Sequence, residues 1–287
     1  MSVKSDRWYP DVASLAGIAV AIGLVLLGQA LEGGRVGSIL QGTAAVIVFG
    51  GTLGAVLTSF SLADIVRAGR SLRDVFFARR NDADDTVERI VGYAQTARRQ
   101  GIMAIENELD KEPNPFLRGG LMLAIDGASV ADVRETLAVE NEALLEYAER
   151  PARVYESAGG YAPTIGILGA VLGLINVMEH LTEPSRLGAG VATAFVATVY
   201  GVGAANLVLL PIAAKIRLRA DRQARMRELA IDGVLAIQEG ANPRLIEQKL
   251  RARFAAETAV RDAVPALPGR ARRPAPLGPA FGVGESR

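Results

Sequence analysis

The chain of 287 residues contains no cysteine and only one histidine, His180. The lack of cysteine excludes disulfides, thiolate nucleophiles and cysteine-ligated metals, and a single histidine excludes a multi-histidine metal site. Aromatic residues make up only 5%, and 32 Lys+Arg against 31 Asp+Glu leave a net charge of +1. No basic stripe interleaved with aromatics is present, so nucleic acid is not an expected partner. The composition predicts neither a metal site nor a cofactor.

Charge is also missing from four long stretches of the sequence. These uncharged runs cover residues 12–30, 36–63, 157–178 and 187–214. A helix needs about 20 apolar residues to cross the hydrocarbon layer, so all four runs qualify. The first run exceeds the roughly 7–15 apolar residues of a signal peptide and is therefore predicted to be a retained helix. A multi-pass membrane protein is indicated, and a soluble globular enzyme is excluded.

None of the four runs contains Asp, Glu, His, Lys or Arg. Ionisable groups inside a membrane mark proton relays and ion paths. The chain alone is therefore not predicted to be a complete pump or transporter, and a partner must bring any titrating carboxylate. Nucleophile, metal and phosphate-loop patterns are missing as well. Gly188 with Gly190, and Gly201 with Gly203, leave the dinucleotide fingerprint incomplete, so no catalytic residue is expected.

The orientation in the membrane follows from the placement of Lys and Arg. The two short loops after the first and third runs hold one cation each, Arg35 and Arg186. Two cations precede the first run, 13 lie in residues 61–160, and 15 follow Pro211. Both termini and the large middle segment are therefore predicted to be cytoplasmic.

The expected fold is an all-α integral membrane protein. Its four transmembrane helices carry a large helical cytoplasmic domain between spans 2 and 3, and a cytoplasmic C-terminal helical tail. The predicted units are a transmembrane hairpin at 1–63 (spans about 12–30 and 36–62) and a cytoplasmic domain at 64–156. A second hairpin at 157–214 (spans about 157–178 and 187–214), cytoplasmic helices at 215–256 and a disordered tail at 257–287 follow.

Small residues crowd spans 3 and 4, where they allow close approach of helix backbones. Either the two spans pack on each other, or both line an oligomeric channel around a foreign helix. Prolines 163 and 211 lie at the cytoplasmic side of these spans, as harmless terminal prolines or as hinges. The six cations between Lys215 and Arg227 are either a positive-inside anchor or a contact with anionic membrane lipid.

Four strings give the chain a family resemblance. They are APTIGILGAVLGLI at 162–175, ATVYG at 197–201, IDGVLAIQEGANPR at 231–244 and RRQGIMAIE at 98–106. With the four-span layout, they resemble the flagellar motor stator A subunits of the MotA/PomA family, in the MotA/TolQ/ExbB proton channel superfamily. The resemblance covers residues 10–254.

The resemblance implies a homo-pentamer around a dimer of a MotB/PomB-type B subunit, in the bacterial inner (plasma) membrane. That partner has a single span, a proton-binding aspartate and a peptidoglycan-binding domain. Ion flow in such complexes turns the A ring, whose cytoplasmic domains push the rotor protein FliG. Arg98 and Glu106 match the family's rotor-contact positions, with Arg99 and Glu108 as weaker candidates. Without the family they would be interpreted as a solvated face.

The resemblance also assigns roles within the membrane. Pro163 and Pro211 match two functional prolines, and Thr198 matches a threonine near the ion path, where Ala170, Tyr200 and Asn206 are further candidates. Sodium-driven members carry hydroxyls where this chain has Ala170 and Ala197. Because hard oxygen ligands are missing there, H⁺ is predicted as the coupling ion rather than Na⁺.

Two rival functions come from related ion-driven machines. One is an energiser of the TolQ/ExbB type, although such subunits have three spans and a different loop arrangement. The other is a stator-like complex that drives a process other than flagellar rotation. The Arg98–Glu106 string favours the flagellar alternative.

Overall fold

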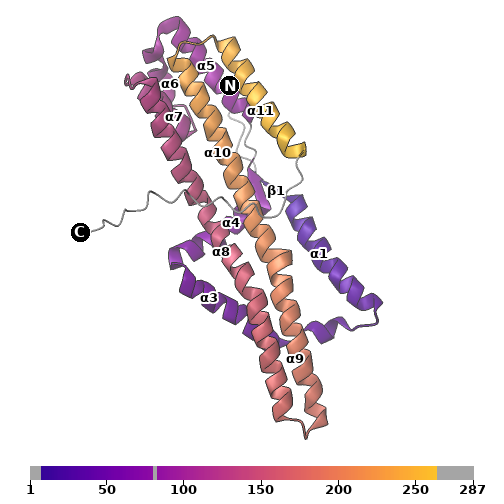
Figure 1. Cartoon of the computed structure of the whole chain (residues 1–287). Coiled ribbons are helices and arrows are strands. Elements are labelled where there is room, and N and C mark those ends of the chain that lie inside the picture. Colours follow the sequence, from indigo (N-terminus) through magenta and orange to yellow (C-terminus); the bar gives the residue numbers. More distant parts are fainter. Residues whose placement is uncertain (1–7, 80–82, 264–287) are drawn as a thin grey trace, which may run out of the picture.

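The computed structural model describes residues 8–79 and 83–263. Two very long helical segments lie side by side and antiparallel along the length of the molecule (Figure 1). The first is α8 (Val130–Glu179); the second combines α9 (Pro184–Gly203), a π-helical segment η4 (Ala204–Leu209) and α10 (Leu210–Gln238). Each long helix therefore has a membrane-spanning part at one end and enters, at the other, the domain that is predicted to be cytoplasmic, which we call the cytoplasmic domain. The predicted domain boundary at 156–157 falls inside the uninterrupted α8.

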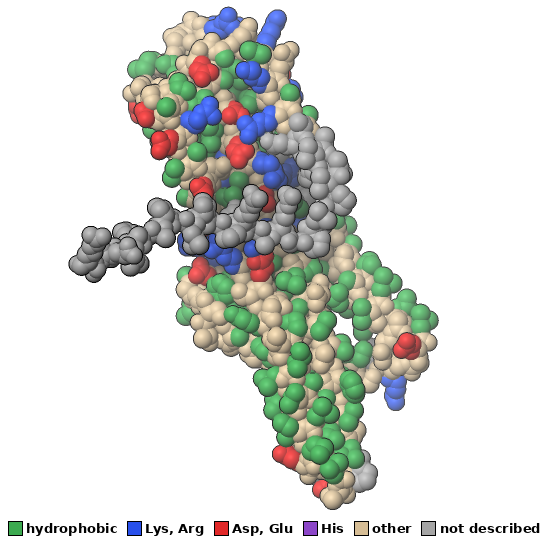
Figure 2. Space-filling view, viewed as in Figure 1, with side chains coloured by type: hydrophobic (Ala, Val, Ile, Leu, Met, Phe, Trp, Pro, Cys, Tyr) green, Lys and Arg blue, Asp and Glu red, His purple; other side chains and the backbone are tan. Residues whose placement is uncertain are grey.

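Among the described residues, four helical segments are long and apolar enough to span a membrane, as predicted: Val12–Leu31, Gly42–Ser59, and parts of Val130–Glu179 and Leu187–Gln238. Hydrophobic side chains cover the lower part of the molecule, where α8 and α9 run together (Figure 2). Charged side chains gather over the upper part. This separation is the one expected for a membrane region joined to an aqueous domain.

Span 2 differs from the single helix predicted over 36–62. It begins with a 3₁₀ turn η1 (Val36–Ile39), breaks at Leu40, and continues as α2 (Gly42–Ala45), the π-helical η2 (Val46–Gly50) and α3 (Gly51–Ser59). The Tyr200 hydroxyl donates to the Ile39 carbonyl at 2.7 Å and accepts from the Gln41 amide at 3.2 Å. A side chain of span 4 therefore satisfies the backbone groups that the break leaves open.

The cytoplasmic domain is built from α4 (Leu62–Phe76), α5 (Ala83–Gln100), η3 (Ile102–Ile105), α6 (Glu106–Leu109), α7 (Pro115–Ile125), α11 (Pro243–Ala263) and the ends of α8 and α10. Its main core is a cluster of buried side chains that includes Ile90, Leu117, Leu121, Leu137 and Leu229, whereas Val75 of α4 packs in a separate cluster with Ile212. Helix α7 is apolar but has only 11 residues, and six of them are buried. It is therefore a core helix of this domain, as its length predicts.

Helix ends follow the capping signals in the sequence. The Ser129 hydroxyl accepts from the Asp132 amide at 3.1 Å and donates to its carboxylate at 2.7 Å. Gly240 ends α10 with φ +69°, and the Asn242 side chain caps α11. Helix α11 continues to Ala263. The predicted start of the disordered tail at 257 is therefore too early. The alanine-rich turns that follow Phe254 favour helix and continue α11. The rest of that tail, from 264, lies outside the described residues.

A pair of three-residue strands was not predicted. Strand β1 (Trp8–Pro10) runs antiparallel to β2 (Phe77–Arg79), and the Asp11 amide continues the pairing by donating to the Phe76 carbonyl at 2.7 Å. Three residues are too few to show an alternating pattern in the sequence. The pair attaches the start of span 1 to the end of α4.

Candidate functional site

Small residues bring α8 and α9 into backbone contact. A Cβ atom built on Gly166 would lie 2.9 Å from the Ala197 carbonyl oxygen, and one built on Gly201 would lie 2.5 Å from the Ala162 carbonyl oxygen. At Gly173 the nearest atom would be the Ala194 amide nitrogen, at 2.8 Å. The small residues thus pack the two spans of one chain on each other, which is the first of the two alternatives raised by the sequence.

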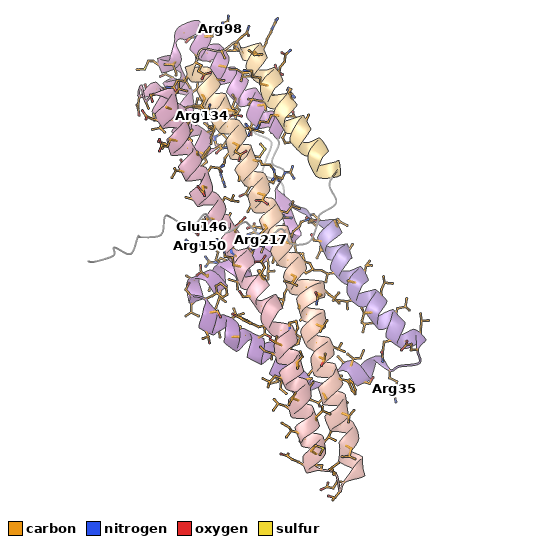
Figure 3. The ribbon with its side chains drawn as sticks, in the orientation of Figure 1. Arg35, Arg98, Arg134, Glu146, Arg150 and Arg217 are labelled. Carbon is orange, nitrogen blue, oxygen red and sulfur yellow. The ribbon has the colours of Figure 1, made fainter. Side chains whose placement is uncertain are left out.

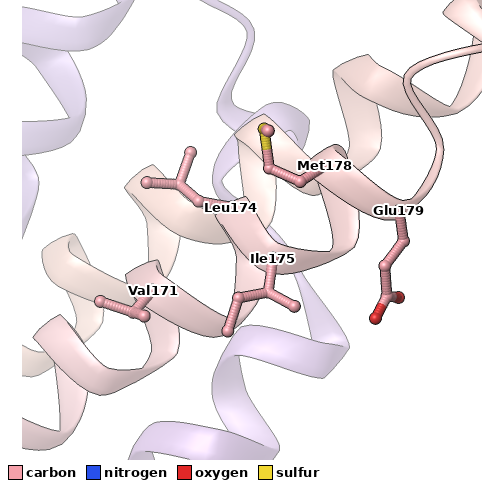
Figure 4. Close-up of a pocket in the computed structure, with 5 residues that line it drawn as sticks. All are labelled: Val171, Leu174, Ile175, Met178 and Glu179. Carbon is pink, nitrogen blue, oxygen red and sulfur yellow. The ribbon is translucent and has the colours of Figure 1, made fainter.

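Large apolar side chains on the other faces of this hairpin remain uncovered. They are Ile167, Leu168, Val171, Leu172, Leu174, Ile175, Met178, Phe195, Val199 and Val202, all more than 40% exposed. A groove of about 410 Å³ lies on α8 near the loop to α9, lined by four of them and Glu179. Figure 4 shows these five side chains along the last turns of α8. These faces are available to lipid or to another helix.

The four predicted ion-path residues do not form one cluster. Tyr200 turns towards span 2, where its ring stacks on Phe49 with 5.7 Å between centroids and its hydroxyl bonds the chain at Ile39. Thr198 and Asn206 donate to carbonyls of their own helix, at 3.4 and 3.0 Å. Ala170 is half-buried on α8. Tyr200 therefore has a structural role that the sequence did not indicate. Within the described residues, no group of acidic or histidine side chains is placed to hold a metal.

Both predicted hinge prolines lie inside continuous helical segments. Pro163 is within α8, and Pro211 is the second residue of α10, separated from the π-helical η4 by Leu210 alone. A Cβ on Gly159, one turn before Pro163, would touch Leu210, which precedes Pro211. The two prolines therefore lie at about the same level of the α8–α10 pair. Proline has no amide hydrogen, so Pro211 cannot donate the usual helical hydrogen bond. The π-helical segment η4, just before it, accommodates this gap in the hydrogen-bond pattern.

The predicted rotor-contact residues lie at the end of the molecule opposite the membrane spans, where Figure 3 shows Arg98. Arg98 and Arg99 end α5, Gly101 breaks the helix with φ +88°, and Glu106 opens α6. Arg98, Arg99 and Glu106 are exposed, and they form no ion pair with any described residue. Glu108 instead folds back and accepts from the Thr96 hydroxyl at 3.1 Å. We call Arg98, Arg99 and Glu106 the cytoplasmic charge patch.

A buried carboxylate that was not predicted from the sequence supports this patch. Glu112, 3% exposed, accepts from the Tyr93 hydroxyl at 3.0 Å and from the Asn114 amide at 2.8 Å. The Arg89 guanidinium lies 3.2 Å away. Burial raises the pKa of Tyr93, and the neighbouring Glu112 raises it further. Glu112 therefore ties the segment after α6 to α5, which carries Arg98.

Charged side chains also join the elements at the cytoplasmic membrane boundary. The Asp11 carboxylate caps α1 by accepting from the Ser14 amide, and it lies 2.7 Å from Lys215 Nζ and 2.9 Å from Arg219. Arg219 also donates to the Val75 carbonyl at 3.0 Å. The hydrogen bond from Lys215 is the main cause that lowers the pKa of Asp11 to about 2.

Several of the six cations after span 4 are therefore engaged within the chain. Besides Lys215 and Arg219, Arg217 pairs with Glu156, and Arg227 donates to the Asn141 side chain at 3.2 Å. Figure 3 places Arg217 between Arg98 at one end of the molecule and Arg35 towards the other. This arrangement supports the anchor interpretation of these cations more than the interpretation as a lipid contact.

The Asp11 cluster leads to a testable prediction. In Asp11→Asn the cap of α1 is kept, but Lys215 and Arg219 lose their counter-charge. We expect the free energy of unfolding to fall by about 2 kcal/mol at pH 6, because the fold lowers the pKa of the Asp11 carboxyl from 3.8 to about 2. A lowered carboxyl pKa stabilises the fold above pH 3.8 and ceases to do so as the pH falls through 2. The difference in the free energy of unfolding between the variant and the wild type should therefore become smaller below pH 4.

Thermal unfolding of the detergent-purified protein between pH 6 and pH 2.5 measures this difference. Glu146→Gln is the matched control, because its pair with Arg153 at 3.7 Å is exposed and should contribute little. A constant difference across this pH range would contradict the assignment of the Asp11 charge.

Comparisons with known proteins agree with this architecture. The motility protein A N-terminal family matches residues 15–101, and the MotA/TolQ/ExbB proton channel family matches residues 108–229. Motility protein A of Bacillus subtilis (strain 168) is 34% identical over 244 residues, which are 84% of this chain and 89% of that protein. The chemotaxis protein PomA of Vibrio alginolyticus is 32% identical over 241 residues, 84% of this chain and 94% of that protein.

Solved structures match at the level of the whole fold. The flagellar MotAB stator complex from Bacillus subtilis contains a chain with a TM-score of 0.79 and 32% identity, covering 88% of this chain and all of that one. C. jejuni MotAB gives a TM-score of 0.78 at 28% identity, covering 84% of this chain and 94% of that chain. The chain therefore belongs to the motility protein A group of the MotA/TolQ/ExbB proton channel family.

Proposed function

We propose that this chain is the A subunit of a flagellar motor stator. With a B subunit it forms an ion channel that converts ion-motive force into torque on the rotor. The observation that carries the proposal is a membrane region whose four uncharged runs contain no Asp, Glu, His, Lys or Arg, in a chain whose continuous helix α8 runs from this region into the domain that carries the exposed charge patch. Such a chain can transmit motion but needs a partner to bind the ion.

The proposed partner is a MotB-type subunit with one span, a proton-binding aspartate and a peptidoglycan-binding domain. Five copies of this chain surround two copies of the MotB-type subunit. The uncovered apolar faces of α8 and α9 support this arrangement, because they can receive another helix once α8 and α9 have packed on each other. The matching family is a proton channel family, so we propose a channel component rather than an enzyme and assign no catalytic residue.

The proposed site is the bacterial inner membrane with both termini in the cytoplasm. The distribution of Lys and Arg supports this orientation. The cytoplasmic charge patch then lies deepest in the cytoplasm, where it would contact FliG. Pro163 and Pro211, at the level where the long helices leave the membrane, are the proposed coupling points between ion passage and this patch.

The proposed coupling ion is H⁺. Thr198 and Asn206 bond their own helix, and Ala170 and Ala197 supply no side-chain oxygen. A sodium ion would therefore find few hard ligands on these spans. Sodium dependence gained by Ala170→Thr would support the assignment, whereas a wild-type motor that stops in sodium-free medium would overturn it.

A deletion strain tests the function as a whole. We expect cells that keep intact flagellar filaments by staining but do not swim, with swimming restored by the gene in trans. The parent should swim in sodium-free medium. Normal swimming of the deletion strain, with no second stator gene to compensate, would mean that the complex drives another process, as in TolQ/ExbB-type energisers.

Charge reversal tests the contact with the rotor. Arg98→Glu and Glu106→Arg should each reduce soft-agar spreading by more than half at unchanged protein level, because both side chains are exposed and unpaired among the described residues. Arg134→Glu, an exposed site on α8 in the same domain, is the control and should spread normally. Equal effects of all three would argue against a specific contact at the cytoplasmic charge patch.

A further inference from the structure

Helix α4 runs along the boundary between the membrane spans and the cytoplasmic domain, because both of its ends are attached there. At its start, only Phe60 and Ser61 separate it from Ser59, the last residue of span 2. A chain extends by at most about 3.5 Å per residue, so α4 begins within about 10 Å of the end of that span. At its end, the Phe76 carbonyl accepts from the amide of Asp11, the residue that caps span 1. A helix held in this way at both ends lies along the membrane surface, beside α8 (Figure 1).

The outward face of α4 combines exposed apolar side chains with arginine. Its inner face packs on α8 and α10 through the buried Ala68 and Val75. On the opposite face, Leu62 is 71% exposed, Val66 is 52% exposed, and Arg70 follows one turn later. This combination is typical of a helix in the headgroup layer, where apolar side chains enter the acyl region and cations stay at the level of the phosphates. The outward face of α4 therefore fits a lipid surface.

Two arginines share one aromatic ring at the same level. Tyr147 of α8 is half exposed, and the guanidinium carbon of Arg67 from α4 lies 4.1 Å from the centre of its ring. The guanidinium carbon of Arg150 lies 5.9 Å from the same centre. Figure 3 shows Arg150 near Arg217, far from Arg98 at the end of the cytoplasmic domain. The ring attracts both guanidinium groups and so holds two cations at the boundary.

The positive charge at this place is only partly compensated within the chain. Asp64 lies 3.6 Å from Arg67, in the same part of α4, and Glu146 of α8 pairs with a different arginine. Arg70 and Arg150 form no ion pair with any residue that the structure describes. A planar guanidinium can bind a phosphate through two parallel hydrogen bonds. Two such groups without a counter-charge therefore lie where lipid phosphates are expected.

We propose that Arg67, Arg70 and Arg150 bind the phosphate of an anionic phospholipid, with Tyr147 holding two of them in place. A lipid is the expected occupant, rather than free phosphate, because the exposed apolar side chains of α4 extend the site into the acyl region. A zwitterionic lipid is disfavoured because its ammonium group would approach uncompensated arginines. The site goes beyond the proposed motor function and does not depend on it.

Photolabelling in nanodiscs tests the proposal. The protein, purified from its own membrane with the subunits that accompany it, is placed in phosphatidylcholine nanodiscs that contain a phosphatidylglycerol with a diazirine close to the headgroup. A parallel sample carries the same diazirine on phosphatidylcholine. After illumination, labelled residues are mapped by mass spectrometry. The phosphatidylglycerol probe should label residues 62–73 about tenfold more than the phosphatidylcholine probe. Both probes should label span 1 equally, since none of its residues is buried.

A double variant probes the arginines themselves. Arg70→Gln with Arg150→Gln removes the two uncompensated charges and leaves the contact between Arg67 and Tyr147 in place. The labelling ratio at residues 62–73 should fall close to one, because each cation beside an anionic headgroup contributes about a factor of five. Arg118→Gln with Arg134→Gln is the matched control. It removes two exposed cations from the cytoplasmic domain and should leave the ratio unchanged.

Several outcomes would overturn the proposal. Equal labelling of residues 62–73 by the two probes would mean that the arginines do not select the headgroup. No labelling there by either probe would mean that a neighbouring subunit covers this face. Loss of the labelling in millimolar inorganic phosphate would make free phosphate the occupant. A ratio that stays high in the double variant would place the bound lipid elsewhere, and an equal fall in the control variant would indicate attraction by overall charge alone.

Discussion

Gly201→Leu is expected to separate the two long helices and to abolish swimming. A Cβ at this position would lie 2.5 Å from the Ala162 carbonyl oxygen and 3.1 Å from the Gly166 Cα atom. Both are backbone atoms, so no side chain can rotate away, and the helices must move apart. Since close backbone packing is what holds helices together in lipid, the whole contact between α8 and α9 is weakened. Immunoblots of membranes, thermal unfolding in detergent and soft-agar spreading measure the loss.

Gly188→Leu provides the matched control for this variant. Gly188 lies on the same helix, and a Cβ there meets no atom within 4 Å. Its membrane level and unfolding midpoint should stay close to those of the wild type. A Gly201→Leu protein that unfolds at the wild-type temperature and swims normally would show that this contact does not hold the hairpin together.

Glu112→Ala is expected to destabilise the cytoplasmic domain by about 3 kcal/mol. The substitution leaves the Tyr93 hydroxyl and the Asn114 amide without their acceptor and the Arg89 guanidinium without its counter-charge. Removing one partner of a buried ionic cluster costs about 3–5 kcal/mol, and partial exposure of Arg89 places the value at the low end. Because this cluster ties the segment after α6 to α5, swimming should fall even where the protein still folds.

Hydrogen exchange separates this effect from general unfolding. Amides of residues 102–112 should exchange faster in Glu112→Ala, whereas those of α8 within the membrane should not change. Asp110→Ala, an exposed site two residues earlier, should behave like the wild type. Glu112→Gln keeps an acceptor, so its amide exchange rates at residues 102–112 should lie between those of Glu112→Ala and the wild type. Unchanged exchange at 102–112 would contradict the supporting role of Glu112.

Local signals in the sequence predicted the helical framework well. The uncharged runs located the four spans, and Ser129, Gly240 and Asn242 set helix ends through caps that involve only neighbouring residues. The errors arose where tertiary contacts overrule local preference. Span 2 breaks at Leu40 because Tyr200, about 160 residues away, satisfies its open backbone groups. The strand pair β1–β2 was missed since each strand has only three residues.

The candidate site divides in the same way. The family strings predicted rotor contacts at Arg98 and Glu106, which remain predictions. The break at Gly101 follows from the sequence, but Glu108 folds back onto Thr96. Glu112 gave no local signal. A buried carboxylate resembles an exposed one in a sequence, and only the packing of Tyr93 and Arg89 around it gives it a structural role.

By itself, the sequence determined that this is a four-span membrane protein, and it predicted the orientation of the spans and the need for a partner that binds the ion. These properties depend on runs and counts of residue types, because the bilayer sorts charge and length along the chain. Only the tertiary structure decided that Asp11 pairs with Arg219, 208 residues later, and that Glu112 is buried beside Tyr93 and Arg89. Such contacts depend on how the helices meet, and the energies that select them act between residues far apart in the sequence.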